Sequence, residues 1–240
     1  MFRSSLNKLL LYGVDAAASV VRPVMNRVMM RQATDIPLER QRRALASTVD
    51  YIQQYMPHVR GAASKFELLS TAFKQADTSG ERLICEFGVF TGGTINFISR
   101  LTTKTVYGFD SFEGLPEDWS ETGIKKGHFA VKKLPAVRIN VTLIKGWFNE
   151  TLPGFLAQNK GMIGFLHIDC DLYSSTRIVL ELLQPRLGPG AVVVFDEYFN
   201  FPDWEQGEYK AFTEFLARTG LSPKFLGYHC KSQQVAVALA

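Results

Sequence analysis

The sequence predicts an α/β protein with a Rossmann-like, doubly wound sheet that is mostly parallel, with an antiparallel C-terminal hairpin and an N-terminal helical cap. From residue 81 onward, short apolar runs alternate with segments whose apolar residues recur at helical spacing. This alternation is typical of βαβ units. The 240 residues, 46% of them hydrophobic, are enough for one large core of this kind.

Each expected strand is a short apolar run that ends near a glycine or an acidic residue. The expected strands are residues 83–87, 105–109, 141–145, 163–168 and 191–195. The expected helices of this region are residues 94–103, 173–183 and 205–218. Two last runs, residues 224–229 and 233–239, are joined by a polar turn, which predicts an antiparallel hairpin at the edge of the sheet.

Residues 1–60 predict a helical cap rather than an independent domain, and residues 61–240 the α/β domain. The apolar stretch 9–21 is interrupted by Asp15 and is shorter than the ~20 residues of a membrane-spanning helix. It also lacks the cleavage site of a signal peptide. Residues 1–43 hold eight Lys and Arg against three Asp and Glu. This basic segment fits a cap on the core, a contact in a homo-oligomer, or a weak contact with a membrane surface.

The composition of the remaining chain excludes several classes of function. Its charges nearly balance, and no basic stripe with interleaved aromatic residues predicts a nucleic-acid partner. The three cysteines, Cys85, Cys170 and Cys230, are odd in number and far apart, so a disulfide framework or a thiolate metal site is not expected. Reduced thiols predict a cytoplasmic protein.

A glycine-rich turn follows the first of these strands. Gly88, Gly92 and Gly93 allow the backbone to pass close to a ligand at the start of a helix. The spacing differs from a dinucleotide fingerprint, because Phe90 stands where the second glycine would fall. Glu86, at the entrance of the turn, disfavours a pyrophosphate and suits a cationic or zwitterionic ligand.

The ends of the next two strands complete the expected ligand site. Asp110 follows Glu86 by 24 residues, close to the offset of about 20 at which an acid meets ribose hydroxyls in such folds. The loop that begins with Ser111 and Phe112 offers an aromatic face and backbone donors to a purine. Gly146 and Trp147 add a second aromatic wall, although Trp147 fits a core position equally well.

Four acids follow two further strands. Asp169 and Asp171 come after residues 163–168, and Asp196 and Glu197 come after residues 191–195. If these strands are neighbours, their carboxylates converge. Converging carboxylates either raise one another's pKa or hold a hard cation. His167 lies on the same strand face as Asp169, which predicts a hydrogen-bonded core histidine or a support for that acid.

Five segments, taken in order, resemble class I S-adenosylmethionine-dependent methyltransferases of the macrocin O-methyltransferase group. They are residues 86–93, 108–116, 146–153, 169–176 and 194–198, and the resemblance extends over about residues 81–240. It implies S-adenosylmethionine as cofactor and divalent-metal-dependent methylation of a sugar hydroxyl in a natural product or glycan. The implied partner is a small hydroxylated acceptor, glycosidic in character.

The resemblance also implies residue roles. Asp169, Asp196 and Glu197 match metal ligands for Mg²⁺ or Mn²⁺, and Asp171 matches the general base, so that the catalytic pair is Asp171 and Asp169. Together with the residue patterns above, it assigns cofactor binding to Glu86, Gly88, Phe90, Thr91, Gly92, Asp110, Ser111, Phe112, Gly146, Trp147 and Asp169. Glu197 departs from the family, which has an aspartate there, and its longer arm changes the reach of that ligand.

Two other functions stay open at this point. One is a methyltransferase of the same fold with a phenolic or amine acceptor. The other is a non-catalytic, membrane-peripheral protein that retains the fold. The aromatic segment 198–204 is interpreted as a wall or lid facing the acceptor, or as a subunit contact.

Overall fold

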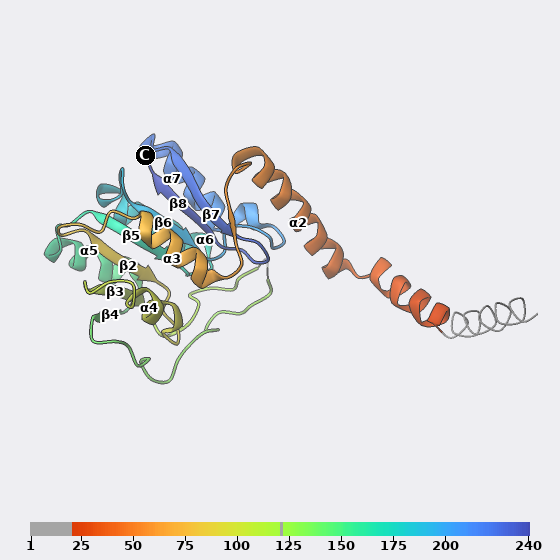
Figure 1. Ribbon diagram of the computed structural model, residues 1–240. Helices are drawn as coiled ribbons and strands as arrows, with labels where there is room; N and C mark the ends of the chain where they lie inside the picture. Colours follow the sequence, from red (N-terminus) through yellow and green to blue (C-terminus); the bar gives the residue numbers. More distant parts are fainter. Residues whose placement is uncertain (1–20, 121) are drawn as a thin grey trace, which may run out of the picture. The chain divides into compact units, whose positions relative to one another are not determined.

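A computed structural model describes residues 21–120 and 122–240, and its centre is an eight-stranded sheet in the order β1-β7-β8-β6-β5-β2-β3-β4 (Figure 1). The strands are β1 (Gly61–Ala62), β2 (Leu83–Phe87), β3 (Val106–Asp110), β4 (Val141–Lys145), β5 (Ile163–Ile168), β6 (Val192–Phe195), β7 (Pro223–His229) and β8 (Val235–Leu239). Only β8 runs antiparallel to its two neighbours among these strands. The predicted doubly wound sheet with an antiparallel hairpin is therefore confirmed.

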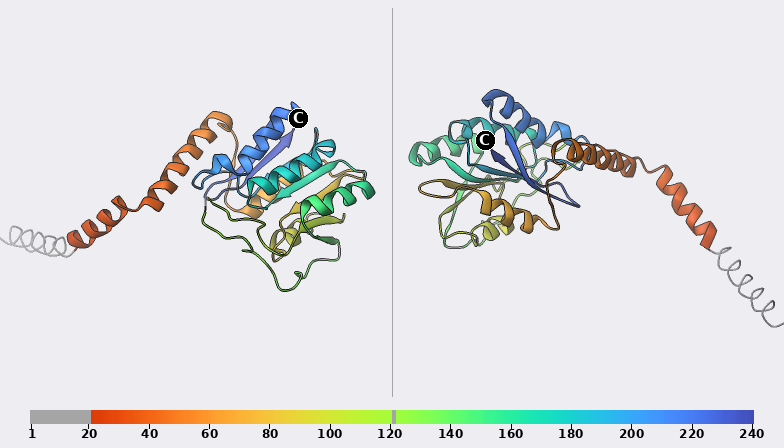
Figure 2. Two further views of the ribbon diagram at one scale, coloured as in Figure 1. Left: turned by 180° about the vertical axis from the view of Figure 1, so that it is seen from behind. Right: turned by 45° about the horizontal axis from the view of Figure 1, so that its top comes forward.

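Helices cover both faces of the sheet (Figure 2). They are α2 (Ile36–Tyr55), α3 (Lys65–Gln75), α4 (Gly93–Ile98), α5 (Phe148–Gln158), α6 (Tyr173–Leu183) and α7 (Glu208–Thr219), with short 3₁₀ turns η1 (Gln184–Arg186) and η2 (Trp204–Gln206). One apolar cluster joins α3 and α4 to one face, and a second joins α5, α6 and α7 to the other. The sheet is thus buried on both sides, which explains why its central strands are continuous apolar runs.

Three elements differ most from the sequence expectation. Helix α4 ends at Ile98, five residues before the predicted end at residue 103. Helix α5 was not predicted, because Pro153 lies inside it and proline lacks the N–H that a helix interior uses. The two-residue strand β1 pairs with β7, so the predicted hairpin is not the outermost part of the sheet. By contrast β2, β4, β5 and α6 have the predicted bounds.

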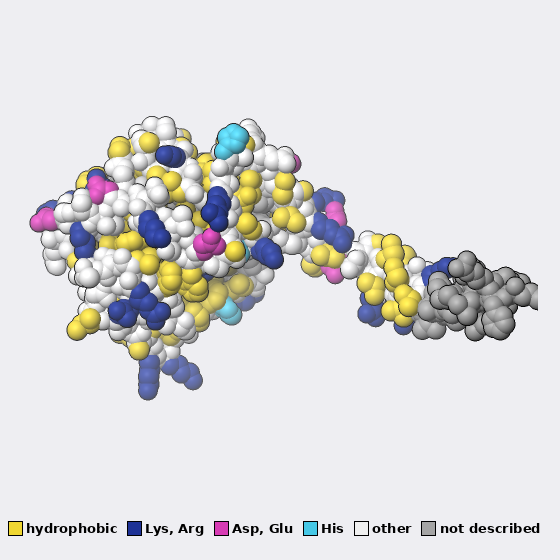
Figure 3. All heavy atoms as spheres, in the orientation of Figure 1, with side chains coloured by type: hydrophobic (Ala, Val, Ile, Leu, Met, Phe, Trp, Pro, Cys, Tyr) yellow, Lys and Arg dark blue, Asp and Glu magenta, His cyan; other side chains and the backbone are white. Residues whose placement is uncertain are grey.

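The chain divides into two compact units, Met1–Arg43 and Ala44–Ala240, and α2 contains the division. Residues 21–33 are helical and expose apolar side chains such as Val24, Val28 and Met29 (Figure 3). Most of the apolar stretch 9–21 lies outside the described residues. No helix in the described ranges has both the length and the apolar character needed to cross a bilayer. The predicted domain boundary at residue 60 stays a prediction.

The aromatic segment after β6 belongs to the core. Tyr198, Phe199 and Trp204 are almost fully buried, and the Tyr198 hydroxyl lies 3.0 Å from that of Tyr51 on α2. The Trp204 indole N–H donates to Ser47 Oγ at 3.0 Å. The interpretation of this segment as an acceptor-facing wall is wrong, because its side chains fill the space between α2 and the sheet.

Candidate active site

The site lies where the strand order reverses, at the carboxyl ends of β2 and β5. After β2 the chain forms β3, which pairs with β2 on the side away from β5. After β5 it forms β6, which pairs with β5 on the side away from β2. The loops that leave these strands separate there and open a crevice, as is general in open α/β sheets. Ligands of such folds bind in that crevice.

Gly88 is the closest backbone contact across this reversal. Its φ is +89°, and a Cβ placed on it would lie 1.7 Å from the carbonyl oxygen of Asp169. The Asp169 N–H in turn donates to the Phe87 carbonyl at 2.8 Å. Only glycine satisfies both the dihedral angle and the contact, which explains the glycine directly after β2.

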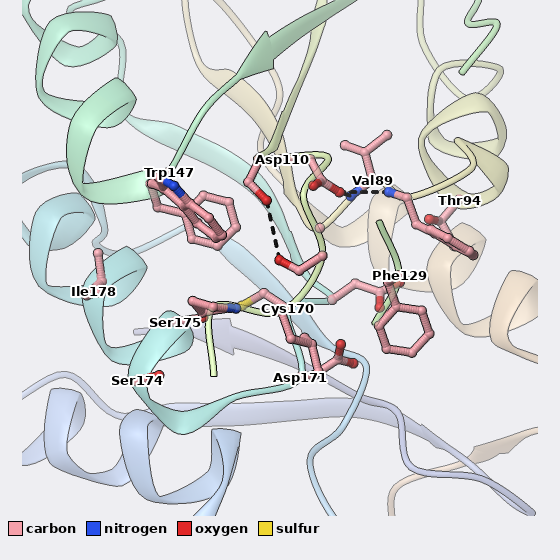
Figure 4. A pocket seen from close by; sticks show the side chains of 18 of the residues that line it. Val89, Thr94, Asp110, Phe129, Trp147, Cys170, Asp171, Ser174, Ser175 and Ile178 are labelled. Atoms are coloured by element: carbon pink, nitrogen blue, oxygen red, sulfur yellow. Dashed lines mark hydrogen bonds between the residues drawn. The ribbon is translucent and has the colours of Figure 1, made fainter. Parts of the chain in front are cut away.

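A cavity of about 570 Å³ opens at this edge of the sheet. Figure 4 shows Trp147 and Phe129 on opposite sides of it, with Asp110 and Asp171 between them. The predicted site residues that line the cavity are Gly88, Phe90, Thr91, Asp110, Ser111, Trp147, Asp169 and Asp171. The same cavity is therefore lined by most of the residues expected to hold the cofactor and by two of the four acids, Asp169 and Asp171.

Asp110 holds the glycine turn in place. One carboxylate oxygen accepts from the backbone N–H groups of Val89 and Phe90, both at 2.8 Å, and the other accepts from Phe112 N–H at 2.6 Å. A carboxylate offers about four acceptor positions, so three bonds leave capacity for a hydroxyl group in the cavity. The position agrees with the predicted role toward a ribose.

Four of the predicted cofactor residues do not line the cavity: Glu86, Gly92, Phe112 and Gly146. Gly92 has φ +80° and directly precedes α4, while Gly146 has φ +140° after β4. Phe112 is buried and has φ +60°. These three shape the turns from which the lining residues project.

Glu86 lies beneath the cavity rather than in it. It is fully buried, and one of its oxygens lies 2.8 Å from His167 Nδ1. Among the described residues, none donates a hydrogen bond to the other oxygen. His167 is the predicted core histidine, and its Nε2 lies 3.4 Å from Asp196, so it connects the end of β2 to the end of β6.

The structure brings three of the four acids into one group. Single oxygens of Asp169, Asp171 and Glu197 lie within 4.8 Å of one another, close enough to share one metal ion. The buried Glu197 Oε2 accepts no hydrogen bond from any residue that the structure describes. Asp171 has φ +65°, an uncommon angle for a residue with a side chain. Such outliers gather at functional sites.

The fourth acid, Asp196, is held apart by other donors. Its Oδ2 accepts from Lys65 Nζ at 2.8 Å and from Gln234 Nε2 at 3.1 Å, and its Oδ1 faces His167. Lys65 Nζ also lies 3.7 Å from Asp169. The structure therefore groups Asp171, and not Asp196, with Asp169 and Glu197. The predicted ligand set of Asp169, Asp196 and Glu197 stays a prediction.

The pKa values also distinguish Asp196 from Asp169 and Asp171. Burial, reinforced by the charge of Asp196, raises the pKa of Asp169 to about 8 and that of Asp171 to about 7. Burial acts on Asp196 too, but the hydrogen bonds and charges of His167 and Lys65 hold its pKa well below the ordinary value. Asp169 and Asp171 therefore bind protons more tightly than an ordinary aspartate does, whereas Asp196 favours the ionised form.

His167 is the second internal cation of this region. Burial alone lowers its pKa, but the hydrogen bonds to Asp196 and Glu86, with the charge of Glu86, raise it to about 10. The raised pKa favours the imidazolium form, which can donate from both nitrogens. It neutralises part of the charge that the acids bring into the core.

Sequence reasoning missed several residues of the site. Lys65, Phe129 and Gln234 come from α3, from the loop after β3 and from the turn before β8. A capping box does mark the start of α3, since Ser64 Oγ accepts from Glu67 N–H at 3.1 Å. Nothing in that local pattern connects Lys65 to acids more than a hundred residues away.

Comparison with known proteins finds a family match and several relatives over about half of the chain. Residues 85–198 match the family described as a methyltransferase domain. The chain is 34% identical over 140 residues to 8-demethyl-8-(2,3-dimethoxy-α-L-rhamnosyl)-tetracenomycin-C 4'-O-methyltransferase of Streptomyces olivaceus, covering 48% of this chain and 52% of that protein. It is 28% identical over 141 residues to mycinamicin III 3''-O-methyltransferase of Micromonospora griseorubida, covering 48% and 54%.

Solved structures agree with this assignment at the level of the fold. The calicheamicin methyltransferase CalS11 superimposes with a TM-score of 0.58 at 23% identity, over 89% of this chain and 90% of that one. The chain spans about half the length of the curated relatives it matches. The predicted resemblance to class I S-adenosylmethionine-dependent O-methyltransferases of the macrocin type is confirmed.

Proposed function

We propose that this protein, which contains a methyltransferase domain of the S-adenosylmethionine-dependent class, methylates a sugar hydroxyl of a natural product or glycan. The observation that carries the proposal is the single cavity that joins Asp110 and the glycine turn to Asp169 and Asp171. A methyl donor held at the first end meets a nucleophile held at the second. The names of the two curated relatives, both O-methyltransferases of natural products and one acting on a rhamnosyl compound, support the acceptor class.

The donor end is built for S-adenosylmethionine. Asp110 retains an acceptor position for a ribose hydroxyl, and Trp147 and Phe129 provide aromatic faces on opposite sides of the cavity. Gly88 lets the backbone approach the ligand closely. The acids at the other end suit the positive sulfonium group.

Asp171 is the proposed general base. It lines the cavity, and its backbone at φ +65° is held in a conformation that few side-chain-bearing residues adopt. Methyl transfer from a sulfonium is an in-line displacement, so the protein mainly aligns the hydroxyl and removes its proton. Asp169 lies beside Asp171 and orients the hydroxyl in this scheme.

The acids fit a divalent cation, which we propose to be Mg²⁺ or Mn²⁺. The buried, unpartnered Glu197 Oε2 and the convergence of Asp169 with Glu197 support this fit, because hard cations prefer carboxylate oxygens. Asp169, Asp196 and Glu197 would hold the ion. When bound, such an ion lowers the pKa of a hydroxyl group and orients it.

The proposal is tested by incubating the purified protein with S-adenosylmethionine and a panel of glycosylated acceptors, with mass spectrometry as readout. We expect a gain of one methyl group on a sugar ring and loss of turnover in EDTA. Asp196→Ala should abolish turnover while calorimetry shows little change in S-adenosylhomocysteine affinity. Methylation of an amine acceptor that persists in EDTA would contradict both the acceptor class and the metal.

A further inference from the structure

Lys65 places a positive charge inside the acidic cluster. Its Nζ lies 2.8 Å from Asp196 Oδ2 and 3.7 Å from Asp169 Oδ2. These are two of the three acids proposed to hold the divalent ion. The side chain also lines the cavity and keeps about a third of its surface exposed.

This placement is unusual for the start of a helix. Lys65 is the first residue of α3, where the helix dipole disfavours a positive side chain. The backbone there is fixed by local bonds, because Glu67 accepts from Ala63 N–H at 2.9 Å and Ser64 caps Glu67. The helix dipole is unfavourable for the Lys65 ammonium, whereas the acids across the crevice attract it. The acidic cluster, and not the helix, therefore stabilises the position of the Lys65 side chain.

Acidic side chains outnumber cationic ones around Lys65. Six acidic side chains meet two cationic ones, Lys65 and His167; the acids are Glu86, Asp169, Asp171, Asp196, Glu197 and Glu208. His167 is fully buried between Glu86 and Asp196, and its side chain has no exposure to solvent. Lys65 is the partly exposed one, on a long flexible side chain.

We propose that the Lys65 ammonium is the built-in cation of this cluster and competes with the divalent ion for Asp169 and Asp196. The inference rests on the proposed function, since it concerns the same ion. An incoming ion must release Asp196 Oδ2 from Lys65, and the displaced ammonium then moves within the cavity that it already lines. Lys65 thereby sets how tightly the ion binds.

The test measures Mn²⁺ binding directly, by electron paramagnetic resonance or calorimetry, in the full-length protein. Lys65→Met should bind Mn²⁺ roughly tenfold more tightly than wild type, because a competing charge is removed. Lys65→Arg retains the charge and should not bind more tightly. Lys74→Met removes an exposed lysine from the last turn of the same helix and should leave the affinity unchanged.

A labelling experiment separates displacement from simple charge repulsion. In wild type, Mg²⁺ should increase acetylation of Lys65 by a limiting amount of acetic anhydride, as measured by peptide mass mapping. Labelling of Lys74 should not change. If Mg²⁺ binds and Lys65 labelling stays constant, displacement is wrong.

The remaining outcomes distinguish the two proposals. Equal or weaker Mn²⁺ affinity in folded Lys65→Met overturns the role of Lys65 and leaves the methyltransferase proposal intact. Absence of Mn²⁺ binding in both proteins, with methyl transfer continuing in EDTA, overturns the role of Lys65 and the metal requirement but not methyl transfer. Circular dichroism checks folding, and Lys65→Gln serves if the methionine variant does not fold.

Discussion

The two ends of the cavity are built by different means. At the turn after β2, one carboxylate, Asp110, is satisfied by three backbone N–H groups, and glycine geometry sets the shape. At the ends of β5 and β6, side chains dominate, and acids outnumber the cations among them. Backbone donors meet both oxygens of Asp110 at the first end, whereas at the second end Glu197 Oε2 has no donor among the described residues. The proposed donor site thus consists mainly of preorganised backbone, and the proposed acceptor site consists mainly of charged side chains.

The largest expected effect comes from a substitution at Gly88, where the two ends of the cavity are in contact. Gly88→Ala would place its Cβ against the Asp169 carbonyl at a positive φ, so we expect a loss of about 3 kcal/mol or more in the free energy of unfolding. Urea denaturation measures it. Gly93→Ala is the matched control, because a Cβ there meets no atom within 4 Å. Equal stability of the two variants would mean that the close approach does not constrain the fold.

Asp171→Asn tests the acidic end alone. We expect kcat to fall by about 10²- to 10⁴-fold, as is typical when a general base is removed, with nearly unchanged S-adenosylhomocysteine affinity. Asp50→Asn, on the exposed side of α2, provides the control for loss of a surface carboxylate. A parallel loss of cofactor affinity would show that the two ends do not act separately.

Asp110→Asn tests the glycine turn alone, through cofactor affinity. The amide group replaces one acceptor oxygen by a donor that faces backbone N–H groups, so S-adenosylhomocysteine should bind about tenfold more weakly. Isothermal calorimetry measures this, with Glu113→Gln in the same loop as control. Full affinity in Asp110→Asn would exclude Asp110 as an organiser of the donor end.

The smallest effect concerns the outer support of the acidic end. Tyr51→Phe removes the hydroxyl that pairs with Tyr198, the residue after Glu197, and should lower the free energy of unfolding by about 1 kcal/mol. Burial raises the pKa of Tyr51 to about 12, so the bond persists through the ordinary pH range. Tyr55→Phe, at a half-exposed position on the same helix, should change stability by less than half as much. A larger change in Tyr55→Phe would mean that the pair does not anchor α2.

The sequence predicted well what depends on local pattern. Strands such as β2 and β5 are apolar except for Glu86 and His167, because both sheet faces are covered. The predicted acids Asp169 and Asp171 follow β5 directly. Helix α5 escaped prediction because Pro153 is a local signal against a helix that the surrounding packing overrides. The aromatic segment after Glu197 was misassigned because an apolar loop is equally typical of a ligand wall and of core packing.

The site was predictable in its members but not in their partners. Asp169, Asp171 and Glu197 converge as the neighbouring strands require. The pairing of Asp196 with Lys65 and Gln234 depends on α3 and on the turn before β8, which are distant in the chain. Glu86 likewise lies near the end of β2 that faces the cavity, but its carboxylate is hydrogen-bonded to the buried His167.

The positive φ angles of Phe90, Phe112, Phe129 and Asp171 carry a consequence for thermal adaptation. Each side chain held in the left-handed region costs about 1–3 kcal/mol relative to glycine or an unstrained angle. Phe90, Phe129 and Asp171 line the cavity and Phe112 lies in the loop that borders it, so the proposed site is also a region where this fold can gain stability. Directed evolution for heat resistance alone would be drawn to these positions, and the variants it selected there would outlast the parent enzyme while turning over less substrate.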